Sequence, residues 1–355
     1  QAENTEDNLI ARPNGAVELY YDNSKKLETS STGATVTGAI TGTADATINS
    51  VNIGKGANSV AGNTVLGEGA LDAAVTGSAN TAVGFEALTS NTSGIRNTAV
   101  GRKSLRSVTT GQQNTAVGQS ALSNNTASNN TAVGHDALVA NTTGTRNTAV
   151  GSLALDANTT GNDVTAIGYS ALSANTANSN VGVGSSALGV NTSGTNNVSV
   201  GTGSLASNTT ANNNTALGTS ALNQNTTGGD NTAVGSAALD ACTTGGVNTA
   251  VGGRALTGIT TGAENTAVGY DSLSECTDAV QCVAVGAYAL ETNSSADRCV
   301  AIGYKALEAN QASDLVAVGY YAALKNTTGT QNTAIGRQAL EQNQTGSSNT
   351  AVGYN

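Results

Sequence analysis

The chain is poor in the large apolar side chains from which most protein cores are built. Among its 355 residues there is no Trp and one Phe, and Leu, Ile, Val and Phe together number 64. So little apolar bulk, when combined with high net charge, is typical of disordered chains. Charged residues make up only 11% of this chain, however. A thick core is therefore excluded, whereas a thin core that repeats a few small contacts is not.

Basic residues, long apolar runs and histidine are also scarce. The 14 Lys and Arg are scattered and the formal net charge is −10, which argues against nucleic acid as a partner. No run of 18 or more apolar residues occurs, so we expect no insertion into a membrane. The single histidine, His135, precedes Asp136 at a variable position, whereas a general base needs a positioned partner. We therefore expect a protein that is not an enzyme and has no cofactor.

Methionine is absent, and the chain begins at Gln1. Because translation starts at Met, we interpret the chain as a processed mature form or a trimmed one. A removed signal peptide is the simplest source of such a start.

What the chain has in abundance is a repeat built on the segment NTAVG. The Gly that closes this segment recurs eighteen times between Gly67 and Gly353, at steps of 17 residues with three steps of 16. The residue before the Gly is Val, Ile or Leu, and a Leu follows four positions after it, with Ala323 as the one exception. A short fixed period of this kind is typical of a solenoid.

Each repeat is too short for a pair of helices, which needs about 34 residues. Its apolar segments are two or three residues long and are bounded by Gly or Asn-Thr, which indicates short strands and turns. We expect one rung per repeat, with a strand at Thr-Ala-Val and another at Ala-Leu. Val and Leu would each form a ladder, and the Asn residues would form hydrogen-bonded ladders along the axis. Eighteen rungs about 4.8 Å apart would make a rod on the order of 85 Å long.

Two positions in the repeat are always small. The residue before the ladder Leu is Ala or Ser, and the residue before the closing Val is Ala, Gly or Ser in every repeat except the first, which has Val65. We interpret these positions as places where backbones of different copies approach. A thin coil also leaves apolar surface uncovered, which implies a partner. We therefore expect a homo-oligomer, with a trimer favoured.

The segment NSVNIGKGANSVAGNTVLGEGAL at 49–71 resembles the head repeat of YadA-type trimeric autotransporter adhesins. The downstream TAVG and TAIG segments look like a stretched version of it, so the resemblance covers 49–355. It implies a left-handed parallel β-roll that assembles as a trimer.

The segment ARPNGAVELYYDNSKKLETSSTGATVTG at 11–38 resembles a module of bacteriophage tail-fibre proteins, in which NTAVG arrays also occur. Its residues alternate as strands do around the turn DNSKK, and strands rich in Thr, Gly and Ala are expected at 31–48. We predict an N-terminal β-rich adaptor or cap at 1–48 and a β-solenoid at 49–355.

Cysteines replace Asn in the two expected Asn ladders. Cys282 and Cys299 occupy consecutive repeats of one ladder, and Cys242 and Cys276 lie two repeats apart in the other. Stacked rungs would bring Cys282 and Cys299 within the Cα separation that a disulfide spans. A bond among Cys276, Cys282 and Cys299 and a set of buried free thiols both remain open, and the spacing does not resemble a zinc site.

The residue after the repeat Gly is the variable position of most interest. It is aromatic or His in seven repeats and small or polar in most others. An outward aromatic row could stack on sugars of a host surface, although covering of the turn is the simpler interpretation. Carboxylates after the ladder Leu, such as Asp156, Asp240, Glu291 and Glu308, are interpreted as solubilising charge. The seven residues of the row are Phe85, His135, Tyr169, Tyr270, Tyr304, Tyr320 and Tyr354.

These observations favour an all-β structural protein, an elongated oligomeric solenoid that is the shaft or head of an extracellular or virion fibre. Such a fibre would position or make contact with a host surface, through a glycan or a receptor. The alternative is an extracellular filament that polymerises end to end, because the chain stops within a repeat at NTAVGYN and an uncapped solenoid end exposes strand edges.

Overall fold

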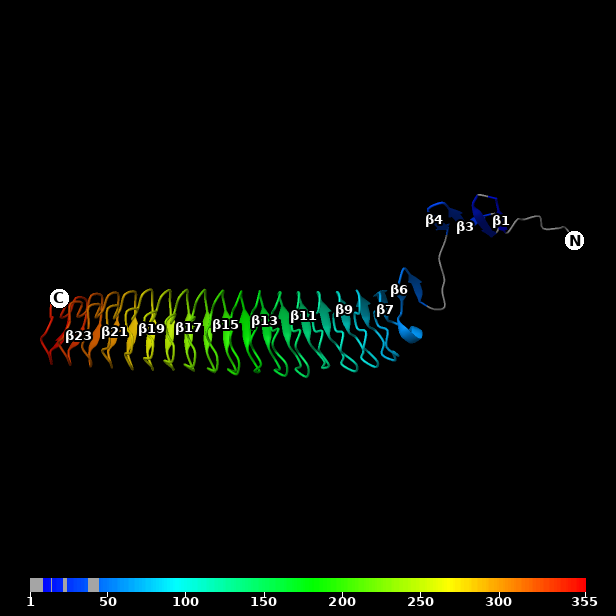
Figure 1. Ribbon diagram of the computed structural model, residues 1–355. Coiled ribbons are helices and arrows are strands. Elements are labelled where there is room, and N and C mark those ends of the chain that lie inside the picture. Colours follow the sequence, from blue (N-terminus) through cyan, green and yellow to red (C-terminus); the bar gives the residue numbers. More distant parts are fainter. Residues whose placement is uncertain (1–8, 14, 22–23, 38–44) are drawn as a thin grey trace. The chain divides into compact units, whose positions relative to one another are not determined.

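A computed structural model of the chain describes residues 9–13, 15–21, 24–37 and 45–355. The chain forms two compact units, residues 1–46 and 47–355, where the sequence places the division between 48 and 49. Figure 1 follows the chain from one end to the other.

The first unit contains a four-stranded antiparallel sheet in the order β1-β2-β3-β4. Two features expected here lie outside the described residues. They are the start of the turn DNSKK, at 22–23, and residues 38–44 of the strands expected at 31–48. Within the sheet, Glu18 is buried and accepts a hydrogen bond from Lys25 Nζ at 2.5 Å. The strands are β1 (Leu9–Ala11), β2 (Val17–Tyr21), β3 (Ser24–Ser30) and β4 (Gly33–Val36).

The second unit is a parallel β-solenoid, as the repeat predicts. Its strands β7–β24 pair in sequence order, each parallel to the next and in register, so that Ala132 lies beside Ala149 and Val133 beside Val150. These strands mark about 17 turns of about 17 residues each. The strands are β7 (Thr64–Gly67), β8 (Thr81–Val83), β9 (Thr98–Val100), β10 (Thr115–Val117), β11 (Thr131–Val133), β12 (Thr148–Val150), β13 (Thr165–Ile167), β14 (Val181–Val183), β15 (Val198–Val200), β16 (Thr215–Leu217), β17 (Thr232–Val234), β18 (Thr249–Val251), β19 (Thr266–Val268), β20 (Val283–Val285), β21 (Val300–Ile302), β22 (Val316–Val318), β23 (Thr333–Ile335) and β24 (Thr350–Val352).

The N-terminal edge of the parallel sheet is covered by strand β6 (Val51–Gly54), which pairs with β7 in the antiparallel sense. Strand β5 (Ala46–Ile48) precedes it, and the short 3-10 helix η1 (Ala57–Ser59) lies between β6 and β7. The backbone N–H of Ala57 donates to the carbonyl oxygen of Leu71 at 3.1 Å. The first turn of the solenoid is therefore closed by a segment that departs from the repeat.

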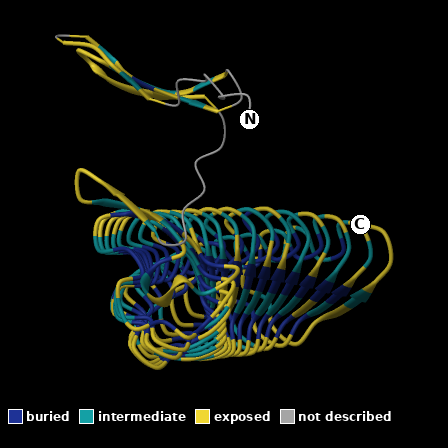
Figure 2. Cartoon of the chain, turned by 90° about the vertical axis from the view of Figure 1, so that its right-hand side faces the viewer, coloured by how far each residue is buried: buried dark blue, intermediate teal, exposed yellow. Residues whose placement is uncertain are grey.

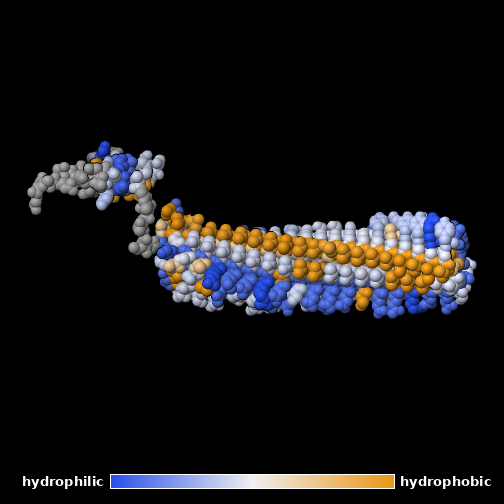
Figure 3. All heavy atoms as spheres, turned by 180° about the vertical axis from the view of Figure 1, so that it is seen from behind, coloured by the Kyte–Doolittle hydropathy of each residue, from blue (hydrophilic) through white to orange (hydrophobic). Residues whose placement is uncertain are grey.

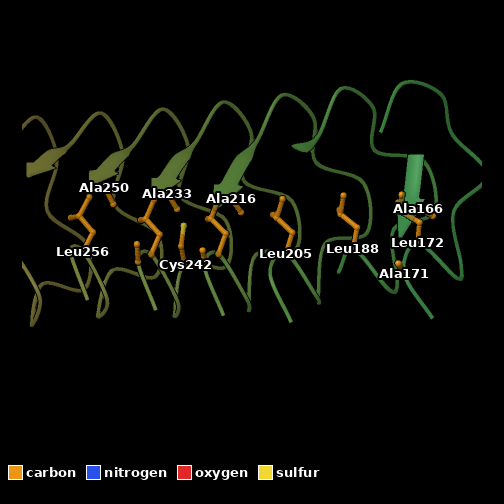
Figure 4. Packing of buried hydrophobic residues seen from close by; sticks show 14 of the residues in the cluster. Ala166, Ala171, Leu172, Leu188, Leu205, Ala216, Ala233, Cys242, Ala250 and Leu256 are labelled. Carbon is orange, nitrogen blue, oxygen red and sulfur yellow. The ribbon is translucent and has the colours of Figure 1, made fainter. Parts of the chain in front are cut away.

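The core lies inside the coil and is thin (Figure 2). In each strand from β8 to β23 the middle residue is buried, while the residues on either side of it are half-buried or exposed. This alternation follows from the period of two in a strand, which sends neighbouring side chains to opposite faces. The ladder Leu residues point at these small middle residues from the opposite wall, as with Leu256 and Ala250 (Figure 4).

This packing corrects two expectations. The segment Ala-Leu is a turn rather than a strand, because the Leu has a left-handed backbone, with φ of +55° at Leu155. The Val residues do form a ladder, which lies on the outer face of the sheet. The small residues do not lie at a contact between copies but inside one chain, since a Cβ built at Gly182 would come 3.0 Å from Leu172 across the coil.

The two Asn ladders are confirmed, and their Asn residues are buried except in the last rung, where Asn343 is half-buried and Asn349 is exposed. In the first ladder, Asn147 receives a bond from the N–H of Val164 at 3.0 Å and donates from Nδ2 to the carbonyl of Gly161 at 2.8 Å. In the second ladder, Asn158 Nδ2 donates to Asn141 Oδ1 at 3.2 Å. Amides of both ladders therefore link one rung to the next, and they satisfy backbone groups that the thin coil seals from water.

Candidate surface-recognition site

The aromatic residues predicted as a row fall into two groups. Tyr270, Tyr304 and Tyr320 belong to one continuous cluster, which we call the tyrosine ridge. Phe85 and Tyr169 are exposed, and the structure gives neither a ring partner among the described residues. The tyrosine ridge consists of Tyr270, Tyr288, Tyr304, Tyr320, Tyr321 and Tyr354.

Rings of the ridge touch from rung to rung. Tyr270 and Tyr288 meet edge to face with centroids 5.7 Å apart, and Tyr288 and Tyr304 do so at 5.9 Å. Tyr304 and Tyr320 are stacked, with centroids 5.5 Å apart and planes at 17°. These separations are the ones aromatic pairs prefer. They follow from the rung spacing, which sets side chains on adjacent rungs about one ring contact apart.

Tyr288 and Tyr321 are ridge residues that lie outside the predicted row. Both occupy the second position after the repeat Gly, where the backbone is left-handed, with φ of +59° and +58°. Their rings reach the neighbours of the first position, and Tyr320 and Tyr321 have centroids 4.1 Å apart. The available signal was a Tyr one place along from the predicted row, in the rung between those of Tyr270 and Tyr304 and again beside Tyr320.

Two cations lie along the ridge. Lys305 Nζ lies 5.3 Å from the ring centroid of Tyr288 and donates to Glu308 Oε1 at 2.5 Å. The Arg337 guanidinium lies 5.6 Å from the Tyr320 ring centroid and 5.1 Å from that of Tyr354, and it donates to the Tyr354 hydroxyl at 2.6 Å. Arg337 thereby joins Tyr354 to the ridge through cation–π contacts.

Carboxylates border the same rungs. Asp271 is nearly buried and accepts a hydrogen bond from Arg254 Nε at 2.6 Å. Burial raises the pKa of Glu291 above its ordinary value, and the nearby Glu308 carboxylate raises it further. Burial also raises the pKa of Tyr288, as do Tyr270 and Asp271. The ridge therefore presents aromatic faces beside hydrogen-bonding groups. Its charged side chains balance, with Asp271, Glu291 and Glu308 against Arg254, Lys305 and Arg337.

The remaining candidates form no second site. His135 is exposed, with its Nδ1 3.2 Å from Asp136 Oδ2. Within the described part of the chain, no three of the His, Cys, Asp and Glu side chains gather in a way that could hold a metal ion. Over the same residues, no helix is both long enough and apolar enough to cross a membrane.

The four cysteines are buried free thiols in the structure. Cys282 and Cys299 do lie in consecutive rungs, where the contact with the Cys282 side chain and burial raise the pKa of Cys299. Burial raises the pKa of Cys242 and of Cys276 to about 11. The contact with Cys299 lowers the pKa of Cys282. The three thiols are not bonded to one another in the structure, and a disulfide among Cys276, Cys282 and Cys299 stays a prediction.

Among the carboxylates that follow the ladder Leu, Asp156 has the least favourable surroundings. Its Oδ1 is buried and has no hydrogen-bond partner. Burial raises the pKa of Asp156, and the nearby Asp136 carboxylate raises it further. An acid whose pKa is raised in the folded state is protonated more readily there than in the unfolded chain. Its ionisation therefore lowers stability as pH rises through the interval between the two pKa values.

We expect Asp156→Asn to raise the free energy of unfolding at neutral pH and to flatten its decline with rising pH in the acidic range. Urea denaturation at several pH values measures both effects. Asp163→Asn is the matched control, because Arg146 lowers the pKa of Asp163. Removal of the Asp163 carboxylate should therefore lower the free energy of unfolding slightly at neutral pH. A destabilised Asp156→Asn protein at neutral pH would contradict the expectation.

No protein-family model matches the chain, and neither a curated protein nor a solved structure is similar to it. The fold itself therefore defines the class, which is that of the parallel β-solenoid repeat proteins.

Proposed function

We propose that the protein is a homotrimeric structural fibre, the shaft or head of an extracellular or virion fibre that positions or makes contact with a host surface. Its role is mechanical and adhesive rather than catalytic. The observation that carries the proposal is an unbroken apolar stripe on the outer face of the parallel sheet.

We call this feature the valine stripe; it is made of the last outward residue of each strand from β7 to β24 (Figure 3). Exposed fractions of 37% at Val133 and 40% at Ile167 are typical of it. A stripe that runs the length of the sheet is unlike the scattered apolar residues of a monomer surface and indicates a covering partner. Its members are Leu66, Val83, Val100, Val117, Val133, Val150, Ile167, Val183, Val200, Leu217, Val234, Val251, Val268, Val285, Ile302, Val318, Ile335 and Val352.

The rest of the outer sheet face fits the same interpretation. The first residue of each strand from β7 to β24 is Thr or Val, so the outward residues of these strands carry no charge. In strands β14, β15, β20, β21 and β22 that first residue is Val, which widens the apolar surface to two ladders. A flat face without charge suits packing against identical faces around an axis parallel to the coil. The resemblance of 49–71 to YadA-type heads supports three copies.

The proposal predicts a mass of three times 34.7 kDa for the protein in solution, measured by light scattering after size exclusion. The double variant Val133→Asp and Ile167→Asp would place charges in the contact, where desolvation opposes burial. We expect this variant to run as a monomer while its circular dichroism keeps the strand signal. Thr143→Asp with Thr160→Asp adds the same charge at exposed turn positions and should remain trimeric.

A wild-type protein that is monomeric at micromolar concentration would overturn the proposal, and a dimer would overturn the number of copies. The filament alternative makes a different prediction, a mass that grows with concentration. It has less support, because β6 covers the N-terminal edge of the sheet in the antiparallel sense and would have to move before another copy could continue it in parallel.

A further inference from the structure

The tyrosine ridge is not required by the fold. Other rungs carry Ser152, Ser185 or Ser236 at the position of Tyr270, and their strands pair in the same register. Six of the nine tyrosines of the chain are nevertheless gathered in the ridge. Aromatic side chains left in water at such a position cost solubility without adding to the core. Their concentration in one run of rungs indicates a ligand.

The geometry of the ridge favours a ligand that is itself periodic. Contacts between rings recur at 5.5 to 5.9 Å along the solenoid axis from Tyr270 to Tyr320. The exposed fractions of 50% at Tyr270, 42% at Tyr320 and 68% at Tyr354 leave ring surface open. A row of similar, weak sites gains affinity when one ligand engages several of them together. A polymer of similar units meets that condition.

The chemistry of the ridge narrows the class of polymer. Its ring faces accept apolar C–H surfaces, whereas Glu291, Glu308 and the tyrosine hydroxyls accept or donate hydrogen bonds at the border. The basic groups are already engaged, since Lys305 is paired with Glu308 and Arg337 is bonded to Tyr354. Asp271 is likewise paired with Arg254, so the ridge has no net positive charge that would attract a polyanion.

We propose that the tyrosine ridge binds a neutral polysaccharide, whose sugar rings stack on successive tyrosines along the solenoid. The proposal rests on the proposed function as a surface-contacting fibre and names the ligand class of that contact. Stacking on the aromatic faces supplies affinity, and the bordering carboxylates and hydroxyls select sugar hydroxyl groups. The pyranose ring suits such a surface because it has an apolar face and a polar rim.

Affinity electrophoresis tests the proposal directly, with dextran, laminarin, mannan, galactan and xyloglucan as neutral probes and alginate as the acidic one. We expect the full-length protein to be retarded by at least one neutral polysaccharide and not by alginate. The triple variant Tyr270→Ser, Tyr304→Ser and Tyr320→Ser should bind that polysaccharide with an affinity at least about tenfold lower. Ser already occupies this position in other rungs, so the fold should be kept.

Tyr169→Ser is the matched control, because Tyr169 has the same place in its rung but lies outside the ridge, and its variant should bind as the wild type does. The proposal would be overturned if alginate alone retarded the protein, or if none of the neutral polysaccharides did. It would also be overturned if the triple variant were retarded as much as the wild type. Light scattering on the same samples separates the two claims. If the protein is a trimer but binds no neutral polysaccharide, the claim about the ligand is wrong while the claim of a trimeric fibre stands. If the triple variant is no longer a trimer, the ridge is an assembly surface instead.

Discussion

Gly252→Ala should destabilise the solenoid strongly, whereas Gly253→Ala, one residue further on, should have almost no effect. Gly252 closes strand β18 with φ of +140°, a conformation that side chains with a Cβ rarely adopt. A Cβ there would also meet the carbonyl oxygen of Gly269 in the next rung, and the carbonyl carbon at 2.7 Å. The neighbour is backbone, and it is held in place by the ladder on both sides, so it cannot move aside.

Strain and overpacking at Gly252 should each cost about 1–3 kcal/mol of the free energy of unfolding. The rung also risks losing the bond from Gly252 N–H to the Val234 carbonyl, which is 2.8 Å long. At Gly253 an added Cβ would find the Tyr270 ring at 3.5 Å, an ordinary contact. A less flexible unfolded chain could even make Gly253→Ala slightly stabilising.

Urea denaturation of the two variants, followed by circular dichroism, measures the difference. Since the two glycines are adjacent, the comparison holds the rung and the local sequence constant. A loss of stability shared equally by both variants, or by neither, would show that adjacent rungs do not approach as closely at Gly252 as the structure has them.

The period of the repeat was sufficient to predict the solenoid, the strand at Thr-Ala-Val and both Asn ladders. It was not sufficient to decide which face of the strand turns inward. Alternation puts Thr148 and Val150 on one side and Ala149 on the other, and the larger apolar residue would ordinarily be assigned to the core. The reverse holds because the coil is narrow: with Leu155 filling it from the opposite wall, only a small residue fits.

The ladder Leu shows a second limit of sequence reasoning. Leu155 is fully buried although its φ of +55° is unfavourable for any residue with a branched side chain. Burial of the whole side chain contributes about 1.5–3 kcal/mol and offsets the cost of that conformation. The local residue types do not predict the left-handed backbone. The same kind of turn placed Tyr288 and Tyr321 on the ridge. Backbone handedness at such positions is set by closure of the rung, which is a property of the whole repeat.

Asn147→Ala is the second substitution for which we expect a large effect. The Asn147 side chain accepts from the N–H of Val164 at 3.0 Å and donates to the carbonyl of Gly161 at 2.8 Å, both in the next rung. All of these groups lie in the buried interior of the coil. Alanine would leave the buried N–H of Val164 without a partner, which costs about 1–3 kcal/mol. The Gly161 carbonyl would lose one of its two bonds but keep the one from Asn158 Nδ2 at 3.1 Å. A loss of this size is a substantial part of the stability of an ordinary domain.

Asn124→Ala is the matched control, because Asn124 is exposed and its backbone is not left-handed, so alanine removes an Asn side chain there without adding strain. That change should alter the free energy of unfolding by less than about 0.5 kcal/mol. Denaturation of the two variants under identical conditions measures the difference. Because neighbouring rungs share the ladder, hydrogen exchange in Asn147→Ala should rise most at the amides of Val164 and its neighbours rather than along the whole coil. Equal stability of the two variants would mean that water or a shifted backbone satisfies the Val164 N–H, and that the buried amide is not what joins one rung to the next.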